Sequence, residues 1–503
     1  MWKKGSLKKK EVPSLTNAAG GKGLFMLRGF LHSTASSLHC MRHRRFWSLN
    51  GFLDSPWFVM LLCALTVLGN ALQIELVIYT LFVLFGIYIC LFGWDLLPLM
   101  SVIVQCYLLP SPANNPGCNR TSIFSPENGG IYLICLIVLL AISLIYRLVT
   151  DPHFGGRRFL HCIRRLLPGI FVLGIGYMLA GAFSGRYYEN GLNNLMFALL
   201  QTVSIGLPYW IFSGAVKWKR TRSDYLSWVG LGAGLTVCCE LIVVYVTQHV
   251  IVNGAIVSGR IFTGWGNANN MGCIIAMMIP FAVDLSHRLK FGWIYSILGI
   301  LMIAFTFLTC SRTSIGAAVL IYVVSMALAI RDPRRRTELL IANGVALALI
   351  VGSGLFHNAV EKLFSDLIQR GLDPRLRDII YVDGLKTFLA HPIFGDTFYP
   401  NTDSIFQWAT IPGFRELIPG RWHNTVIQLL ASCGLVGMGC YSFHRLQTLR
   451  LFWERRRTDV TFIGLSLLAM LLMSLLDCHF FNVGPVLFYS MALSFAEKVN
   501  PAR

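Results

Sequence analysis

Long apolar runs recur along almost the whole chain, and they limit the fold more than any other feature. From Trp57 to near the C-terminus, about fourteen stretches are long and apolar enough to span a membrane. We expect them at 57–74, 76–94, 96–110, 131–147, 167–183, 192–214, 226–250, 271–285, 291–309, 314–330, 338–355, 423–441, 460–476 and 484–496. Because hydrocarbon offers the backbone no hydrogen-bond partner, such stretches are stable there as helices. The sequence therefore predicts an all-α, polytopic integral membrane protein with about 12–14 transmembrane helices.

The basic residues are distributed unevenly between alternate loops. A net charge of +19 could indicate nucleic-acid binding, but with a cytoplasmic N-terminus 32 of the 43 lysines and arginines lie on the inner side. Inner runs include "KWKRTR" (217–222) and "RDPRRR" (331–336). This positive-inside bias places both termini in the cytoplasm of a plasma-membrane protein. It predicts contact with membrane lipid headgroups and no nucleic-acid partner.

One connection is much longer than the others, and it suggests a division of the chain. We expect a basic cytoplasmic segment at 1–56, an N-terminal transmembrane bundle at 57–250, and a second transmembrane region at 251–503 that includes an outer loop at 356–422. A loop of this length is usually functional. It starts with "NAVEKLFSDLIQRG", whose helical apolar spacing predicts an amphipathic helix on the membrane surface. A second helix should follow, with Asp373 as its cap and Pro374 in its first position.

Arginines gather at the outer ends of several predicted helices. The helices that begin near residues 271, 314 and 423 point their N-termini outward, where free N–H groups and partial positive charge favour anions. The arginines beside these ends and in the outer loop are Arg260, Arg312, Arg375, Arg377 and Arg421. Together they predict an outward-facing site for a lipid-linked phosphate or diphosphate. An arginine at a helix end is also typical of snorkelling to headgroups, and for Arg421 both interpretations stand equally.

The remaining polar groups allow two interpretations each. Asn267, Asn269 and Asn270 fall in the outer loop "GRIFTGWGNANNMG", and for the last two we favour simple capping of the next helix. Glu240 lies within a predicted span, where an acid is costly unless it is paired. It either makes a structural hydrogen bond to another helix or marks a pathway through the membrane.

His423 opens the stretch "HNTVIQLLASCGLVGMG" beside the predicted anion site. A diphosphate leaving group needs charge neutralisation, which arginines supply without a metal. The attacking hydroxyl needs a general base, and histidine is suited to that near neutral pH. A histidine next to Trp422 is also typical of an aromatic belt, and this argument alone does not decide between the two. No D-x-D, HExxH or Cys/His ligand pattern occurs, so we predict neither metal nor cofactor.

These motifs resemble the bacterial O-antigen ligase and polymerase family of membrane glycosyltransferases. The resemblance rests on the Gly-x-Asn-x-Asn loop at 266–270, "SRT" at 311–313, "RDIIYVDGLKTFLAHPIFG" at 377–395 and the stretch 423–439. Two departures are Ala268, where proline is usual, and Tyr381, where tryptophan is usual. The three glycines of the last stretch, Gly434, Gly437 and Gly439, predict close helix packing.

The resemblance implies an inverting, metal-independent transfer of a glycan from undecaprenyl diphosphate to an acceptor hydroxyl on the outer face of the plasma membrane. It implies that His423 is the catalytic base, that Arg312 and Arg260 bind the diphosphate, and that Arg377 contacts the substrate. Asn267 lies in the family's asparagine loop and is expected to contact substrate as well. The acceptor stays open between lipid A core (a ligase), another repeat unit (a polymerase) and a protein (an O-oligosaccharyltransferase).

A transporter or flippase of lipid-linked glycans is the competing class of function. It predicts paired charges near the bilayer midplane and broken helices in repeated halves. Glu240 is the only clear acid in the middle of a span, and the sequence has no convincing internal repeat. The polar groups gather at the outer boundary instead, which favours the transferase.

Overall fold

A computed structural model gives the fold of this chain. It describes residues 47–109, 130–150, 165–184, 187–216, 218, 223–252, 255–256, 261–263, 266–352, 361, 365, 377–396, 398, 422–455 and 458–498. Residues 48–503 form one compact unit. The boundary that we expect at residue 250 stays a prediction. The expected amphipathic helix after residue 356, and the cap formed by Asp373 and Pro374, lie outside the described residues.

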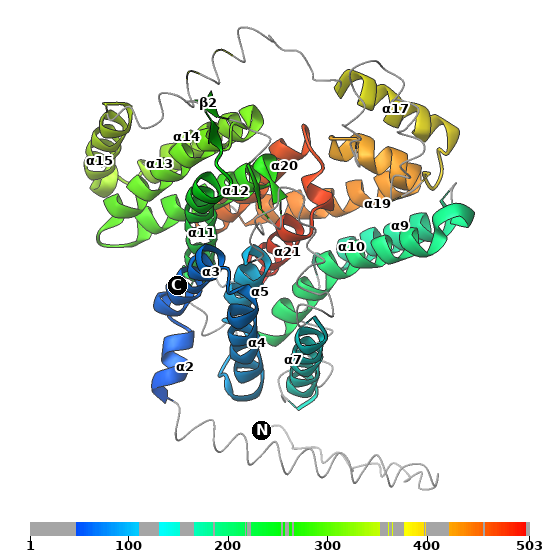
Figure 1. The fold of residues 1–503 in the computed structure, drawn as a ribbon, viewed down its shortest axis with the longest axis horizontal. Helices are drawn as coiled ribbons and strands as arrows, with labels where there is room; N and C mark the ends of the chain where they lie inside the picture. The colour runs from blue at the N-terminus through cyan, green and yellow to red at the C-terminus, as the bar shows by residue number, and fades with distance from the viewer. Residues whose placement is uncertain are drawn as a thin grey trace, which may run out of the picture. The chain divides into compact units, whose positions relative to one another are not determined.

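The described part of the chain is almost entirely helical (Figure 1). Its helices are α2 (Trp47–Leu53), α3 (Pro56–Leu72), α4 (Glu75–Phe92), α5 (Leu99–Leu108), α7 (Gly130–Thr150), α9 (Leu167–Phe183), α10 (Tyr187–Ala215), α11 (Tyr225–Thr247), α12 (Ala268–Arg288), α13 (Gly292–Leu308), α14 (Arg312–Ala329), α15 (Pro333–Gly352), α17 (Arg377–Ala390), α19 (Thr425–Glu454), α20 (Thr458–Ser474), η4 (His479–Phe481) and α21 (Val483–Lys498). Two short antiparallel hairpins interrupt them: β1 (Ile251–Val252) with β2 (Ala255–Ile256), and β3 (Phe262–Thr263) with β4 (Gly266–Asn267).

Every predicted span coincides with a helix, so the all-α polytopic fold is confirmed. Seven of these helices are long and apolar enough to cross a membrane by length and composition: α4, α7, α10, α11, α12, α14 and α19. Five more are apolar but have at most 17 residues. Helix α15 is not among the seven because three arginines and a glutamate in its first turns make it too polar. Helix α21 is not among them because it has only 16 residues. The protein is a multi-pass membrane protein.

Helix α12 lies at the centre of the bundle. All of its residues from Met271 to Ser286 are buried, and it packs against α11, α13, α14 and α20. Close approach to α14 depends on Gly272, because a Cβ atom there would overlap the side chain of Ser314. Near the other end of the helix, buried Asp284 pairs with Arg288 at 2.8 Å. The same carboxylate accepts from the hydroxyl of Ser227 in α11 at 2.6 Å, so the two ends of α12 contact different helices.

Glu240 has a structural partner. Its carboxylate, in buried α11, accepts a hydrogen bond from the side-chain amide of Asn70 in α3. The same amide also bonds the carbonyl of Leu108 at the end of α5, at 3.3 Å. A hydrogen bond to a carboxylate compensates part of the cost of removing it from water. Of the two interpretations of Glu240, this pairing between helices favours the structural one.

Helix α19 is broken at Gly434, where φ is 60° and ψ is −159°. A turn that follows α17 enters the break and replaces the missing helical hydrogen bonds. The N–H of Leu435 donates to the carbonyl of Pro392 at 2.8 Å, and the carbonyl of Ala431 accepts from the N–H of Asp396 at 2.8 Å. Backbone groups freed within a membrane helix need such partners. The "AHPIFG" part of the sequence therefore completes α19.

The glycines of α19 play different parts. A Cβ atom on Gly434 would lie 2.7 Å from the carbonyl oxygen of Pro392, so this glycine allows the turn to enter. Gly437 faces Gly176 of α9, which agrees with the expected close packing. For Gly439 the expectation is wrong, because no atom lies within 4 Å of its added Cβ. Only two of the three glycines thus serve close approach.

Arg445 is half-buried in the second half of α19. Its guanidinium carbon lies 4.8, 4.5 and 5.0 Å from the ring centroids of Tyr441, Phe480 and Tyr489. One of its N–H groups donates to the hydroxyl of Tyr489 at 3.1 Å. Aromatic faces attract a cation, and the attraction is strongest away from water. Through Phe480, Arg445 connects α19 to η4, the short helix that follows Asp477.

Candidate active site

The start of α19 is shaped by Asn424. Its side-chain oxygen accepts hydrogen bonds from the N–H groups of Val426 and Ile427, at 2.9 and 3.2 Å, which is the pattern of a helix N-cap. The preceding residue, His423, has the left-handed backbone conformation with φ 48°. The hydroxyl of Tyr381, from α17, donates to the carbonyl of His423 at 3.2 Å. The helix start and α17 together fix this histidine.

The imidazole of His423 is oriented by Asp477. Nδ1 lies 3.2 Å from Oδ1 of this carboxylate, which follows the end of α20. When the carboxylate accepts the Nδ1 proton, the lone pair of the neutral ring is on Nε2. Among the described residues, no group is hydrogen-bonded to that Nε2, and 31% of the side chain is exposed. The ring is therefore available as a base.

Asp477 is itself held by further hydrogen bonds. Its Oδ2 accepts from the side-chain amide of Asn269 at 3.1 Å, and the carbonyl oxygen of that amide accepts from the hydroxyl of Ser311 at 2.7 Å. Burial alone would raise the pKa of the Asp477 carboxyl. The hydrogen bond to His423 and the nearby His479 outweigh burial and hold that pKa well below its usual range. An ionised Asp477 can accept the hydrogen bond from the Nδ1 proton of His423.

The starts of α12, α14 and α19 thus meet in one network. Ser311 is the N-cap of α14, and Arg312 is the first residue of that helix. Arg312 is half-buried and stands next to the network that ends at His423. Arg377, the first residue of α17, lies one helical turn before Tyr381. Burial raises the pKa of Tyr381 while the positive charge of Arg377 opposes that shift, which indicates that the two side chains are close.

The remaining predicted site residues divide into two groups. Asn267 is described: it caps α12 by accepting from the N–H of Asn270 at 3.1 Å. Its expected contact with substrate stays a prediction. Arg260, Arg375 and Arg421 lie outside the described residues, so their roles also stay predictions.

Sequence reasoning missed the most important partner of His423. The capping interpretation of Asn269 and Asn270 is wrong, because Asn269 bonds Asp477 and Asn270 accepts from Asn482 at 2.8 Å. The signal that could have found Asp477 is its place in "LLDCHFF", a turn between two spans on the same side as His423. An acid at such a turn faces the same compartment as the histidine.

Part of the chain is similar to a known protein family. Residues 297–442 match the family model of O-antigen ligase. The matched part runs from α13 into α19 and contains Arg312, Arg377 and His423. Asn269 and Asp477 lie outside it, so only the structure connects them to the histidine. No curated protein sequence matches this chain.

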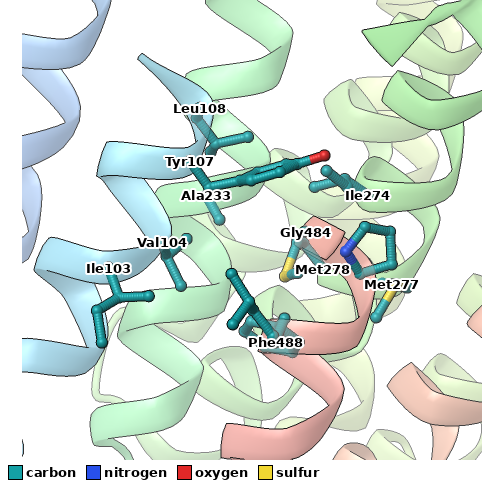
Figure 2. Close-up of a pocket in the computed structure, with 12 residues that line it drawn as sticks. Ile103, Val104, Tyr107, Leu108, Ala233, Ile274, Met277, Met278, Gly484 and Phe488 are labelled. Atoms are coloured by element: carbon teal, nitrogen blue, oxygen red, sulfur yellow. The ribbon is translucent and has the colours of Figure 1, made fainter. Parts of the chain in front are cut away.

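A separate cavity lies between α5, α11, α12 and α21 (Figure 2). Its volume is about 20 Å³, and it is lined by Ile103, Val104, Tyr107, Leu108, Ala233, Ile274, Met277, Met278, Gly484, Pro485, Leu487 and Phe488. That is room for roughly one water molecule. Its lining has no carboxylate, imidazole or cationic group. The cavity therefore offers no side chain suited to acid–base chemistry near neutral pH.

Proposed function

We propose that this protein is a membrane glycosyltransferase that transfers a glycan from undecaprenyl diphosphate to an acceptor hydroxyl, with His423 as general base. One observation carries the proposal: the imidazole of His423 is bound through Nδ1 to the buried carboxylate of Asp477, and 31% of the His423 side chain is exposed. A carboxylate on one nitrogen stabilises the imidazolium that forms when the other nitrogen takes a proton.

The proposed step is a single displacement. Nε2 of His423 accepts the proton of the acceptor hydroxyl while the oxygen attacks the anomeric carbon of the donor glycan. The bond between that carbon and the diphosphate oxygen breaks, and the electron pair leaves with undecaprenyl diphosphate. Attack on the face opposite the leaving group inverts the anomeric centre. Positive charge from Arg312, at the N-terminus of α14, and from Arg377 stabilises the departing diphosphate without a metal or cofactor.

We further propose that the site faces the outside of the plasma membrane. The starts of α12, α14 and α19 share one hydrogen-bond network, so they belong to the same end of the bundle. The basic run at 331–336 follows the opposite end of α14. Because positive loops stay in the cytoplasm, the end with His423 belongs outside.

The acceptor is proposed only as a hydroxyl group. A lipid A core, another repeat unit and a protein all offer such a group, so ligase, polymerase and protein O-oligosaccharyltransferase activities are tested together. A transporter would use charges within the membrane. Since Glu240 is paired with Asn70 in a structural contact, it gives little support to transport.

The test uses the purified protein in lipid nanodiscs with an undecaprenyl-diphosphate glycan and each acceptor class, in EDTA. Removal of a general base costs roughly 10²- to 10⁴-fold, so we expect His423→Ala to lower kcat by about 10³-fold with donor binding kept. Arg312→Ala should weaken donor binding. His287→Ala is the matched control, since this histidine lies in the last turn of α12, at the opposite end of that helix from Asn269. Wild-type kcat in His423→Ala contradicts the base, and activity only with added metal contradicts the mechanism.

A further inference from the structure

His423 holds a backbone conformation that a residue with a side chain seldom adopts. Its φ of 48° lies in the left-handed region, where Cβ crowds the following carbonyl. Such a conformation persists only where surrounding contacts impose it. One of the contacts that impose it comes from α17, which packs beside the start of α19 (Figure 1).

Helix α17 contacts Trp422 and His423, which precede the N-cap of α19. Tyr381 donates its hydroxyl proton to the carbonyl of His423 at 3.2 Å, and the indole N–H of Trp422 donates to Oδ2 of Asp383 at 3.1 Å. The two helices are in direct contact at Gly384, where a Cβ atom would lie 2.8 Å from Cδ1 of Trp422. Trp422 is therefore enclosed between α17 and α19.

The bond between Asp383 and Trp422 is the strongest of these contacts by its chemistry. An indole N–H can only donate, and Trp422 is only 3% exposed, so its N–H needs a partner within the protein. A carboxylate is a stronger acceptor than a neutral oxygen. The backbone N–H of Trp422 is bonded as well, to the side chain of Gln428 at 3.2 Å. Gln428 of α19 thus holds the backbone of Trp422, and Asp383 of α17 holds its indole ring.

We propose that Asp383 is a positioning residue for glycan transfer. Through Trp422 it fixes α17 on the start of α19, and so keeps the backbone of His423 in the conformation that directs Nδ1 to Asp477. The inference rests on the proposed function of His423. Helix α17 then has two roles. It carries Arg377, which is expected to contact the substrate, and it holds His423 in position.

The test is a double-mutant cycle on kcat. Misplacement of a catalytic group by about 1 Å costs roughly 100-fold, so Asp383→Ala should lower kcat by about 100-fold with the KM for the donor kept within about threefold. Asp383→Asn keeps an acceptor oxygen and should restore most of the rate. Trp422→Phe should resemble Asp383→Ala, and the double variant should be no slower than either single variant. Asp378→Ala, on the exposed side of α17, is the control and should keep wild-type kcat.

Hydrogen exchange of residues 377–390 and 422–428 separates this proposal from the proposed function. Asp383→Ala should speed exchange in both segments and leave α12 unchanged. If wild type transfers glycan and Asp383→Ala keeps its kcat, the positioning role is wrong and the function stands. If wild type transfers no glycan, the proposed function is wrong, and exchange alone decides whether Asp383 docks α17. Unchanged exchange in Asp383→Ala overturns the proposal in either case, as do multiplicative losses in the double variant.

Discussion

The replacement of Gly434 by alanine tests how far α19 depends on the turn that enters it. The backbone there, with φ 60° and ψ −159°, belongs to a region that is open essentially to glycine, at a cost of about 1–3 kcal/mol for other residues. The new Cβ would also lie 2.5 Å from the carbonyl carbon of Ile393 and 2.7 Å from the carbonyl oxygen of Pro392. Both are backbone atoms, so the turn itself must move.

Displacement of the turn would break three backbone hydrogen bonds between the turn and α19. The N–H groups of Leu435 and Val436 donate to the turn at 2.8 and 3.1 Å, and the turn donates to Ala431 at 2.8 Å. At about 1 kcal/mol each, plus strain of about 2 kcal/mol, the loss is roughly 5 kcal/mol. Since native stability is typically about 5–15 kcal/mol, this is a large fraction. For a chain of this size we expect the unfolding midpoint to fall by roughly 5 °C.

The measurement is the thermal unfolding midpoint in detergent, followed by circular dichroism and tryptophan fluorescence. Gly439→Ala is the matched control: it lies in the same helix, and an added Cβ meets no atom within 4 Å. Alanine favours a helix over glycine by about 1 kcal/mol, so this control should be as stable as wild type or slightly more so. Equal midpoints for Gly434→Ala and Gly439→Ala would refute the argument, because they would show that the turn carries none of the stability of α19.

Three further predictions concern the network around His423 and the half-buried Arg445. Asn269→Ala should lower kcat by about tenfold, because Asp477 loses a donor that holds it toward His423; an unchanged kcat would show that Asp477 needs no such support. The folded pKa of Asp477 lies below its unfolded value of about 3.9, so its ionised form stabilises the fold above that pH, and the contribution is lost as pH falls toward the folded pKa. Unfolding midpoints of wild type and Asp477→Asn should thus differ by a constant amount at neutral pH and converge below about pH 4. Arg445→Lys should unfold at a lower temperature than Arg445→Met, because an ammonium group cannot spread over three rings and its donors would stay buried without acceptors; the reverse order would indicate that the charge itself stabilises this site.

The helices could be predicted from the sequence because their signal is local. An apolar run longer than the bilayer is thick reads as a helix whatever its neighbours are, and each expected span has its helix. The candidate base was also accessible, because His423 and Arg312 stand at starts of predicted helices on one side of the membrane. These two inferences needed only hydropathy, charge and chain direction.

Contacts between distant parts of the chain could not be predicted in this way. Asp477 lies 54 positions after His423, and Asn269 lies 208 positions before Asp477, so no periodicity connects them. The asparagine loop offers three amides for one cap, and only the hairpin before α12 selects Asn267. The hydropathy of the sequence does not reveal the break at Gly434, because the residues on both sides of it are apolar.

The two points at which the chain is fixed to α19 have a consequence for loop exchange. Asp396 is bonded to Ala431, and Phe398, which is 2% exposed, packs edge-on against Tyr177. Trp422 is bonded to Gln428, so the chain is anchored both before and after residues 399–421. Closing a loop between fixed ends depends only weakly on its length, and doubling it costs about 0.6 kcal/mol. Exchange experiments should therefore keep Asp396, Phe398 and Trp422 and vary only the connection between Phe398 and Trp422. Under the proposed function, such exchanges test whether this connection affects which hydroxyl-bearing molecule is accepted.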